Sequence, residues 1–174
     1  MLSILVPDIY QKSIYDIDYA KLKRNGIKCL IFDLDNTLAA INIKSPNKKL
    51  KDLIEDLKAM DFKILIVSNA PKKRVEPFKE ILCLDSSYLS MKPMKRKFQK
   101  VIKTYKFKPS QIVVIGDQLL TDVWGANRMG FTSILVNPIG TLDFAATKLN
   151  RFLEGIIYRR LEKNDLLKKG HYYE

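Results

Sequence analysis

The sequence predicts a doubly wound α/β fold, in which a mostly parallel, five-stranded sheet carries helices on both faces. Two observations support this prediction. Short apolar runs alternate along the chain with segments whose apolar residues recur at helical spacing. The chain also has 174 residues, of which 47% are hydrophobic. This size and composition favour one domain over residues 1–174, with a substantial core.

Five segments have the composition of strands, and three of them are nearly continuous in apolar residues, as a sheet covered on both faces requires. In chain order they are IKCLIFD (27–33), FKILIVSN (62–69), SYLSM (87–91), QIVVIGD (111–117) and TSILVN (132–137). Helices are expected between them, where the apolar residues have helical spacing. They are NKKLKDLIEDLKAM (47–60), KRVEPFKEIL (73–82), KRKFQKVIKTY (95–105) and TDVWGANRMG (121–130).

A basic amphipathic helix is predicted over residues 147–170. Its apolar residues recur at helical spacing: Leu149, Phe152, Leu153, Ile156, Ile157 and Leu161. Positive charge surrounds them, from Lys148, Arg151, Arg159, Arg160 and Lys163. Such a helix either lies on an anionic membrane surface or packs its apolar stripe on the sheet or on a partner. The sequence leaves both alternatives open.

Composition excludes several classes of protein. Nowhere do about 18 apolar residues run together, so we expect no transmembrane segment. The start, MLSILVPDIYQK, has no basic residue before its short apolar patch, which argues against a secretory signal. Cys29 and Cys83 lack metal-ligand spacing, so reduced thiols and a cytoplasmic protein are expected. The net charge of +12 predicts attraction to phosphate-rich partners, namely nucleic acid, anionic lipid or phosphorylated metabolites.

Polar side chains stand where three of the predicted strands end. Asp33 ends the first strand, Ser68 the second and Asp117 the fourth, and Asp35 follows two residues after Asp33. In an open parallel sheet the loops after the carboxyl ends of the strands form the ligand crevice. We therefore expect these residues to converge on one rim and to form a site.

The residue types at this rim predict phosphoryl chemistry. Crowded carboxylates need a cation among them, and hard oxygen ligands suit Mg²⁺, so Asp33 and Asp117 predict a magnesium site. Asp33 could then attack a phosphate and form an aspartyl-phosphate, with Asp35 as the acid and base. Ser68 and Lys92 are available to bind the phosphoryl oxygens.

Each motif also has a purely structural explanation. DLDNT could be a turn in which Asn36 or Thr37 caps a helix, and VSN an ordinary strand end. Lys92 could be a solvated lysine before proline. GDQLLTD could be a helix N-terminus, where the helix dipole favours aspartate. The order of the motifs and their shared rim favour a functional site instead.

Four motifs resemble, in order, those of the haloacid dehalogenase superfamily: FDLDNTL (32–38), VSNA (67–70), MKP (91–93) and GDQLLTD (116–122). The second acid of the first motif is typical of its phosphatase and phosphomutase branches. Together with PDIYQKSIYDI (7–17) and KKGH (168–171), the chain resembles the YqeG family. These are small subclass IIIA phosphatases related to the mitochondrial phosphatidylglycerophosphate phosphatase of fungi.

The resemblance implies roles for four acids. Asp33 would be the nucleophile and a magnesium ligand. Asp35 would be the general acid and base, with its backbone carbonyl on the metal. Asp117 would be a direct magnesium ligand, and Asp122 would bind the metal or orient its waters.

The resemblance also implies that Ser68, Asn69 and Lys92 bind the phosphoryl group. Members of the superfamily often carry a cap domain over the site. Only about 30 residues separate Asn36 from Ser68 here, and a helix and a strand already occupy them, so we expect no cap domain. An uncovered crevice suits a phosphate carried on a large structure, such as a lipid headgroup in a bilayer, unless a second subunit covers it.

The expected activity is a Mg²⁺-dependent phosphatase, acting on phosphatidylglycerophosphate to give phosphatidylglycerol at the inner face of the membrane. Eight lysines and arginines without an acid between Lys92 and Lys108 would attract an anionic bilayer or nucleic acid, unless they are a solvated helix face. Nucleic-acid ends, phosphoproteins and soluble phosphates remain alternative substrates. A receiver-like signalling module and a non-catalytic RNA- or partner-binding protein remain alternative classes. The sequence does not give the oligomeric state.

Overall fold

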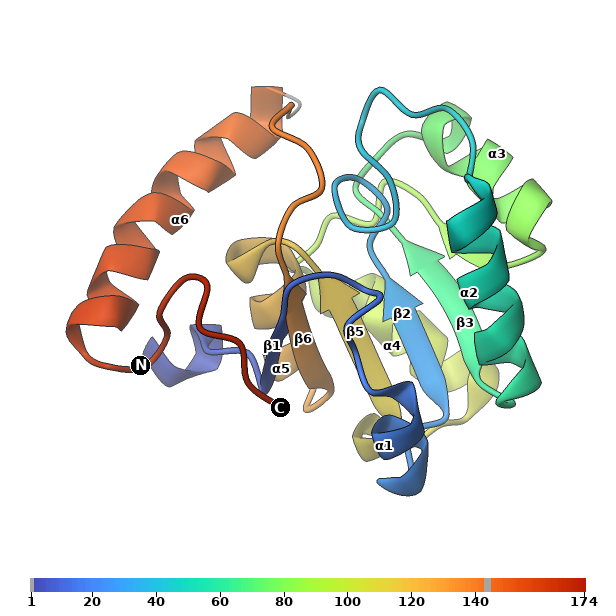
Figure 1. Ribbon diagram of the computed structural model, residues 1–174, viewed down its shortest axis with the longest axis horizontal. Helices are drawn as coiled ribbons and strands as arrows, with labels where there is room; N and C mark the ends of the chain where they lie inside the picture. The colour runs from blue at the N-terminus through green and yellow to red at the C-terminus, as the bar shows by residue number, and fades with distance from the viewer. Residues whose placement is uncertain (1, 143–144) are drawn as a thin grey trace.

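A six-stranded sheet forms the centre of the computed structural model, which describes residues 2–142 and 145–174 and the side chains of all of these except 145–148. The strand order is β1-β6-β5-β2-β3-β4, and every neighbouring pair is parallel (Figure 1). The strands are β1 Ile9–Gln11, β2 Cys29–Phe32, β3 Lys63–Val67, β4 Asp85–Ser87, β5 Ile112–Gly116 and β6 Thr132–Val136. The predicted doubly wound α/β class is confirmed.

Two strand predictions need correction. The sheet has six strands rather than five, because the short β1 pairs with the edge strand β6. Its three residues are too few to show the alternation of apolar and polar residues that predicts a strand. The strand predicted over 87–91 was placed too late, since β4 ends at Ser87. Leu89 and Met91 have φ angles of 44° and 54°, a left-handed conformation that cannot continue a strand.

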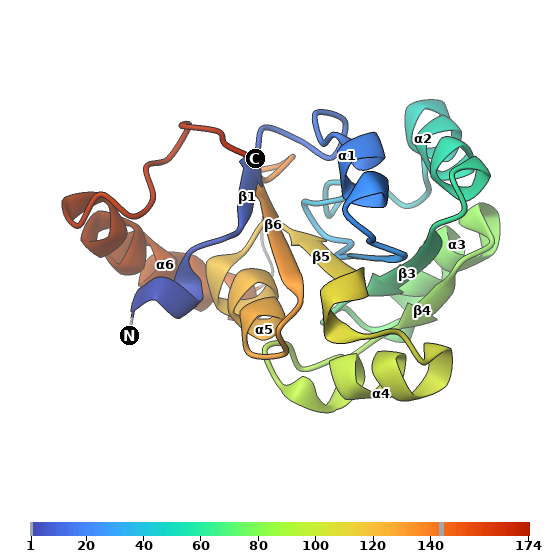
Figure 2. The ribbon, with the colours of Figure 1, turned by 90° about the horizontal axis from the view of Figure 1, so that it is seen from below.

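Helices cover both faces of the sheet. Their bounds are α1 Tyr19–Arg24, α2 Lys48–Ala59, α3 Lys72–Leu82, α4 Lys95–Tyr105, α5 Trp124–Asn127 and α6 Ala145–Lys163. Figure 2 shows α1, α2 and α3 on one side of the sheet and α4 and α5 on the other. The helix predicted over 121–130 is shorter, because the π-helical turn Leu119–Val123 leads into α5. None of the helices in the described ranges is long and apolar enough to cross a membrane.

Alternating side chains of the central strands fill two separate cores. Leu30 and Phe32 of β2 pack with α1, α2 and α3. Cys29 and Ile31 of the same strand pack in the other cluster, against α4. All four side chains are almost completely buried. This two-sided burial is why the strands are nearly continuous in apolar residues.

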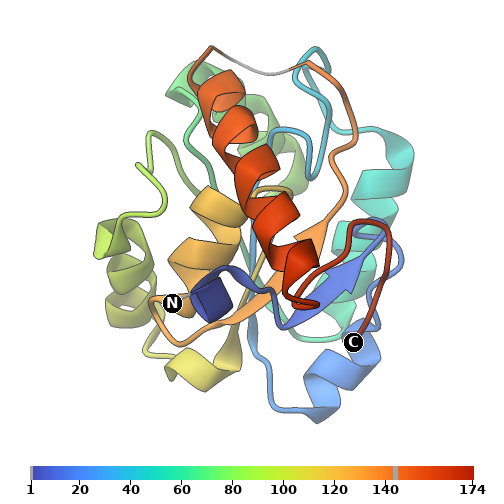
Figure 3. The same ribbon diagram turned by 90° about the vertical axis from the view of Figure 1, so that its left-hand side faces the viewer.

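The C-terminal part of the chain packs beside β1 and β6 as a third core. Leu161 of α6 and Leu167 of the tail are buried there with Tyr10 and Leu135. The helix ends at Lys163 rather than at residue 170, and the tail returns to the sheet. Tyr10 and Tyr173 exchange two backbone hydrogen bonds of 2.9 Å. Figure 3 shows α6 lying across this side of the molecule.

Candidate active site

The candidate site lies where the strand order reverses, between β2 and β5. From β2 the chain crosses over to β3 on one side, and from β5 it crosses to β6 on the other. Phe32 is in register with Ile115, and the Asp33 amide donates a 2.9 Å hydrogen bond to the Ile115 carbonyl. Asp33 and Asp117 therefore leave the carboxyl edge of the sheet side by side, at the place where ligands bind in open α/β sheets.

Three buried carboxylates gather at this edge. Asp33, Asp117 and Asp122 each offer an oxygen, and these oxygens all lie within 4.8 Å of one another. Asp122 comes from the π-helical turn, an irregularity that often occurs at functional sites. Gly116 makes room for it, because a Cβ at that position would overlap the Asp122 carboxylate. The structure thus brings Asp33 and Asp117 together as predicted, and it places beside them Asp122, which the resemblance implied would bind the metal or orient its waters.

Two cations face the carboxylates. The Lys92 ammonium lies 2.6 Å from Asp33 Oδ1 and 2.7 Å from Asp122 Oδ1. Burial opposes its charge, but the two carboxylates outweigh burial and raise the Lys92 pKa above its ordinary value. Arg151, from α6, forms an ion pair with Asp117 and also donates a 3.0 Å hydrogen bond to the Asp117 carbonyl.

The cations do not fully compensate the acids. Burial raises the pKa of Asp33 to about 7, although Lys92 lowers it. Burial likewise raises the pKa of Asp117 to about 8, against the opposing effect of Arg151. In each case the neighbouring carboxylates also raise the pKa. A group of buried acids whose charge is only partly compensated by the neighbouring cations is suited to a divalent cation.

The donor set fits Mg²⁺. Its atoms are carboxylate oxygens, the ligands that this ion prefers. The Thr37 hydroxyl donates a 3.2 Å hydrogen bond to Asp117 Oδ1, and the Gln118 amide donates one of 3.2 Å to Asp122 Oδ2. These bonds fix the orientation of two of the three acids, as supporting groups do around metal ligands. Asp33, Asp117 and Asp122 are therefore the residues that could hold a metal.

Lys92 is held in place by Asn69. The Asn69 side-chain oxygen Oδ1 accepts a 2.7 Å hydrogen bond from the Lys92 backbone amide, and Asn69 Nδ2 donates to the Lys92 backbone carbonyl at 3.3 Å. Asn69, predicted to bind phosphate, thus makes its hydrogen bonds here to the Lys92 backbone. The Ser68 hydroxyl is buried and accepts a 3.1 Å hydrogen bond from the Ala70 amide, which leaves its own proton available for a ligand.

Asp35 lies apart from the three acids. Its carboxylate accepts a 2.8 Å hydrogen bond from Arg74 Nε, within an ion pair that is mostly buried. No helix begins at this motif, since α2 starts at Lys48, so the capping explanation of DLDNT is wrong. Asn36 instead has a φ of 63° and forms a tight turn that turns the chain away from the strand.

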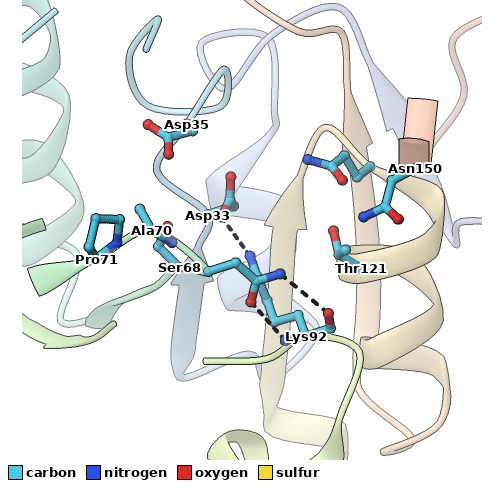
Figure 4. Close-up of a pocket in the computed structure, with 10 residues that line it drawn as sticks. Asp33, Asp35, Ser68, Ala70, Pro71, Lys92, Thr121 and Asn150 are labelled. Carbon is cyan, nitrogen blue, oxygen red and sulfur yellow. Dashed lines mark hydrogen bonds and ion pairs between the residues drawn. The ribbon is translucent and has the colours of Figure 1, made fainter. Parts of the chain in front are cut away.

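A cavity of about 190 Å³ opens beside these groups. Figure 4 shows Asp35, Ala70 and Pro71 on one side of it and Thr121 and Asn150 on the other, with Asp33, Ser68 and Lys92 between. Gln118 also lines the cavity, and its buried Oε1 has no hydrogen-bond partner among the described residues. This oxygen is available to accept a hydrogen bond from a ligand or a metal-bound water.

Sequence reasoning missed several residues of the site. Thr37 and Gln118 stand inside the quoted motifs FDLDNTL and GDQLLTD, so their positions next to the predicted acids could have identified them. Arg74 lies on α3 and gave none. Asn150 and Arg151 lie in the C-terminal helix, for which the sequence predicts only membrane contact or packing. The alternation of charged residues with apolar ones in that helix did not show which of its faces would turn toward the acids.

The comparisons with known proteins agree with this geometry. Residues 2–140 match the family described as mitochondrial PGP phosphatase. The chain belongs to this family. It is 39% identical to the probable phosphatase YqeG of Bacillus subtilis (strain 168), over 95% of this chain and 94% of that protein. It is 25% identical to phosphatidylglycerophosphate phosphatase 1, chloroplastic/mitochondrial, of Arabidopsis thaliana, over 91% of this chain but only 49% of that protein.

Solved structures show the same fold. A HAD-like hydrolase of Porphyromonas gingivalis aligns with a TM-score of 0.56 and 16% identity, over 72% of this chain and 98% of that one. The cobalt-bound deoxy-D-mannose-octulosonate 8-phosphate phosphatase of Haemophilus influenzae aligns with a TM-score of 0.53 and 15% identity, over 84% of this chain and 96% of that one. Fold and family together identify the protein as a phosphatase of the haloacid dehalogenase type.

Proposed function

We propose that the protein is a Mg²⁺-dependent hydrolase that converts phosphatidylglycerophosphate to phosphatidylglycerol through an aspartyl-phosphate. The observation that carries the proposal is the convergence of Asp33, Asp117 and Asp122 with Lys92 at the wall of one cavity. Bound Mg²⁺ would be held by the three acids and would neutralise charge on the phosphate. The Lys92 ammonium and the Ser68 hydroxyl would bind the other phosphoryl oxygens.

The reaction would proceed in two steps on this chain's own residues. In the first step an oxygen of Asp33 attacks phosphorus and the bond from phosphorus to the glycerol oxygen breaks. Asp35 gives a proton to the departing glycerol oxygen. Water then attacks the phosphorus of the aspartyl-phosphate while Asp35 takes a proton from the water. The bond from phosphorus to Asp33 breaks, so inorganic phosphate is released and the Asp33 carboxylate is regenerated. Asp35 would leave its ion pair with Arg74 to reach the reacting atoms, and Asn69 would keep Lys92 in position.

The lipid substrate is supported by the family and by the open site. The matched family and a plant relative carry the name of this activity. Within the described residues the segment from Asp33 to Ser68 holds only a loop, α2 and β3, so it adds no cap domain over the cavity. A phosphate on a bilayer can reach such a site. We further propose that the activity takes place at the cytoplasmic face of an anionic membrane, with nucleic acid as a less favoured partner.

The test compares phosphate release from three kinds of substrate. These are anionic vesicles containing phosphatidylglycerophosphate, a panel of soluble phosphates, and phosphorylated oligonucleotides, each with Mg²⁺ or with a chelator. The proposal predicts the highest kcat/KM on the vesicles and loss of activity with the chelator. Preference for a non-lipid substrate would contradict the substrate and leave the chemistry standing.

The Asp33→Asn variant tests the mechanism separately. Without the nucleophile, turnover of every substrate should fall by roughly a thousandfold or more. Asp85→Asn is the matched control, because Asp85 begins the edge strand β4, two strands away from β2, does not line the cavity and forms an ion pair with Lys63. It should retain near wild-type turnover. Activity of Asp33→Asn close to that of the control would refute Asp33 as the nucleophile.

A further inference from the structure

Helix α6 presents two different faces over residues 149–156. One face is turned to the active site: Asn150 lines the cavity, Arg151 pairs with Asp117, and Glu154 accepts a 2.9 Å hydrogen bond from the Leu120 amide. The opposite face exposes four apolar side chains, a group that we call the α6 stripe. Their exposed fractions are 63% for Leu149, 66% for Phe152, 42% for Leu153 and 36% for Ile156.

The α6 stripe is kept outward by the docking of the other face. Glu154 is 2% exposed and Leu161 is fully buried, so rotation of the helix would expose Leu161 and leave Glu154 without the Leu120 amide. Ile157 and Leu161, which the sequence placed in the same apolar group, pack in the third core. The helix therefore packs on the domain, as one of the two alternatives predicted, and it also leaves an apolar surface exposed.

Two more apolar side chains are exposed before α6, at Ile139 and Leu142. Ile139 and Leu142 are 52% and 59% exposed, and Asn36, beside Asp35, donates a 2.9 Å hydrogen bond to the Leu142 carbonyl. Exposed apolar side chains that gather near a binding cavity are typical of interaction sites. Leu142 is thus tied to the loop after β2 that carries Asp35, and the α6 stripe lies on the same helix as Asn150, which lines the cavity.

Charge identifies the occupant. One turn beyond Ile156 the stripe continues into the exposed residues Arg159, Arg160 and Lys163. The whole chain carries a net charge of +12, so a second copy would bring like charges together. An anionic bilayer instead offers acyl chains to the apolar side chains and negative headgroups to the basic ones.

We propose that the α6 stripe, with Ile139 and Leu142, inserts into the interface of an anionic bilayer and sets the active-site cavity against the lipid headgroups. This inference rests on the proposed lipid substrate, and it adds the surface by which the protein reaches it. Because Asn150 and Arg151 lie on the docked face of the same helix, membrane contact and the cavity are joined by one rigid element.

The experiment measures binding to vesicles that contain phosphatidylglycerol but no phosphatidylglycerophosphate, so that binding does not depend on catalysis. The double variant Leu149→Ser/Phe152→Ser should bind about tenfold more weakly or worse, since two large apolar side chains no longer leave water. Ile81→Ser is the matched control: Ile81 is 45% exposed on α3, on the far side of the molecule (Figures 1 and 2). It should bind like wild type.

Point substitutions are used because deleting residues 147–174 would also remove the buried Leu161 and Leu167. The thermal unfolding midpoint of each variant checks folding, and size-exclusion chromatography checks the oligomeric state. Unchanged vesicle binding by the folded double variant would overturn the inference. So would a wild-type dimer that the double variant abolishes, since the stripe would then be covered by a second copy.

Two further arms separate the inference from the proposed function. The double variant Arg159→Gln/Arg160→Gln should bind anionic vesicles more weakly than wild type. Its slight binding to neutral phosphatidylcholine vesicles should be unchanged. If this variant and wild type bound anionic vesicles equally, the role of charge would be refuted. Hydrolysis of phosphatidylglycerophosphate is then measured independently. Stripe-dependent binding without that hydrolysis would contradict the proposed substrate and leave the docking surface standing.

Discussion

The carboxyl groups of Asp33 and Asp117 combine deep burial with incomplete compensation by cations. Burial raises their pKa values to about 7 and about 8, from the ordinary value of 3.8. In the metal-free protein these groups therefore hold protons over part of the neutral range. A metal ligand must lose its proton, so cation binding and proton release are linked at this site.

Mg²⁺ affinity should consequently rise with pH. Both pKa values are raised, so the acids are protonated below about pH 7 and ionised above about pH 8. We expect the association constant to increase about tenfold or more between pH 6 and pH 8, with release of protons. Titration calorimetry in two buffers of different ionisation enthalpy measures both quantities. A pH-independent affinity without proton release would contradict the burial and coupling described for these acids.

At the residue scale, the sequence was informative where an acid or a hydroxyl stands at the end of a predicted strand. Asp33, Asp117 and Ser68 could be placed because parallel strands end at one edge, and Asp122 and Lys92 through motif resemblance. The ion pairs of Arg74 with Asp35 and of Arg151 with Asp117 could not be predicted, because they depend on how α3 and α6 dock. Such contacts between distant segments leave no local pattern.

Among the elements, the docking of α6 on the domain depends on Glu154, an acid whose charged form is disfavoured by burial. Burial raises the pKa of Glu154 to about 7, despite hydrogen bonds from backbone amides and the charge of Arg151. Glu154 is 2% exposed, and its side chain ties the helix to the π-helical turn that carries Asp122. Its ionisation therefore bears on how firmly α6 docks.

Replacing Glu154 with Gln should change the pH dependence of stability. A folded-state pKa raised from 4.5 to about 7 means that the wild-type protein loses stability as pH rises through this range, by up to about 3 kcal/mol. Glutamine keeps a carbonyl acceptor for the Leu120 amide and does not ionise. In the presence of a chelator, the unfolding free energy of Glu154→Gln relative to wild type should therefore be higher at pH 8 than at pH 5. If the difference in unfolding free energy between Glu154→Gln and wild type were the same at pH 5 and pH 8, Glu154 would not be buried as described.

Element prediction succeeded for long periodic segments and failed for short ones. α2, α3 and α4 lie within a residue or so of their expected bounds, because each buries a regular apolar face. β1 was missed and β4 was misplaced, since each has only three residues. In α6 the apolar spacing was recognised, but the division between a docked face and the α6 stripe requires the tertiary structure.

For the whole molecule, topology determines the chemistry. The order β1-β6-β5-β2-β3-β4 puts β2 and β5 side by side, so residues 84 positions apart, Asp33 and Asp117, meet at one edge. The crossovers then bring Ser68 and Lys92 to the same cavity. The fold class and this convergence followed from the alternation of strands and helices, whereas the position of α6 beside the cavity did not.

The account depends on Asp33 receiving a phosphoryl group beside a divalent cation. A crystal structure of the protein grown with Mg²⁺ and beryllium fluoride, which mimics a phosphoryl group on aspartate, tests this most directly. The account predicts the fluoride adduct on an Asp33 oxygen, next to Lys92 and Ser68, with one ion ligated by Asp33 and Asp117. An adduct on any other residue, or an ion that does not touch both acids, would contradict it.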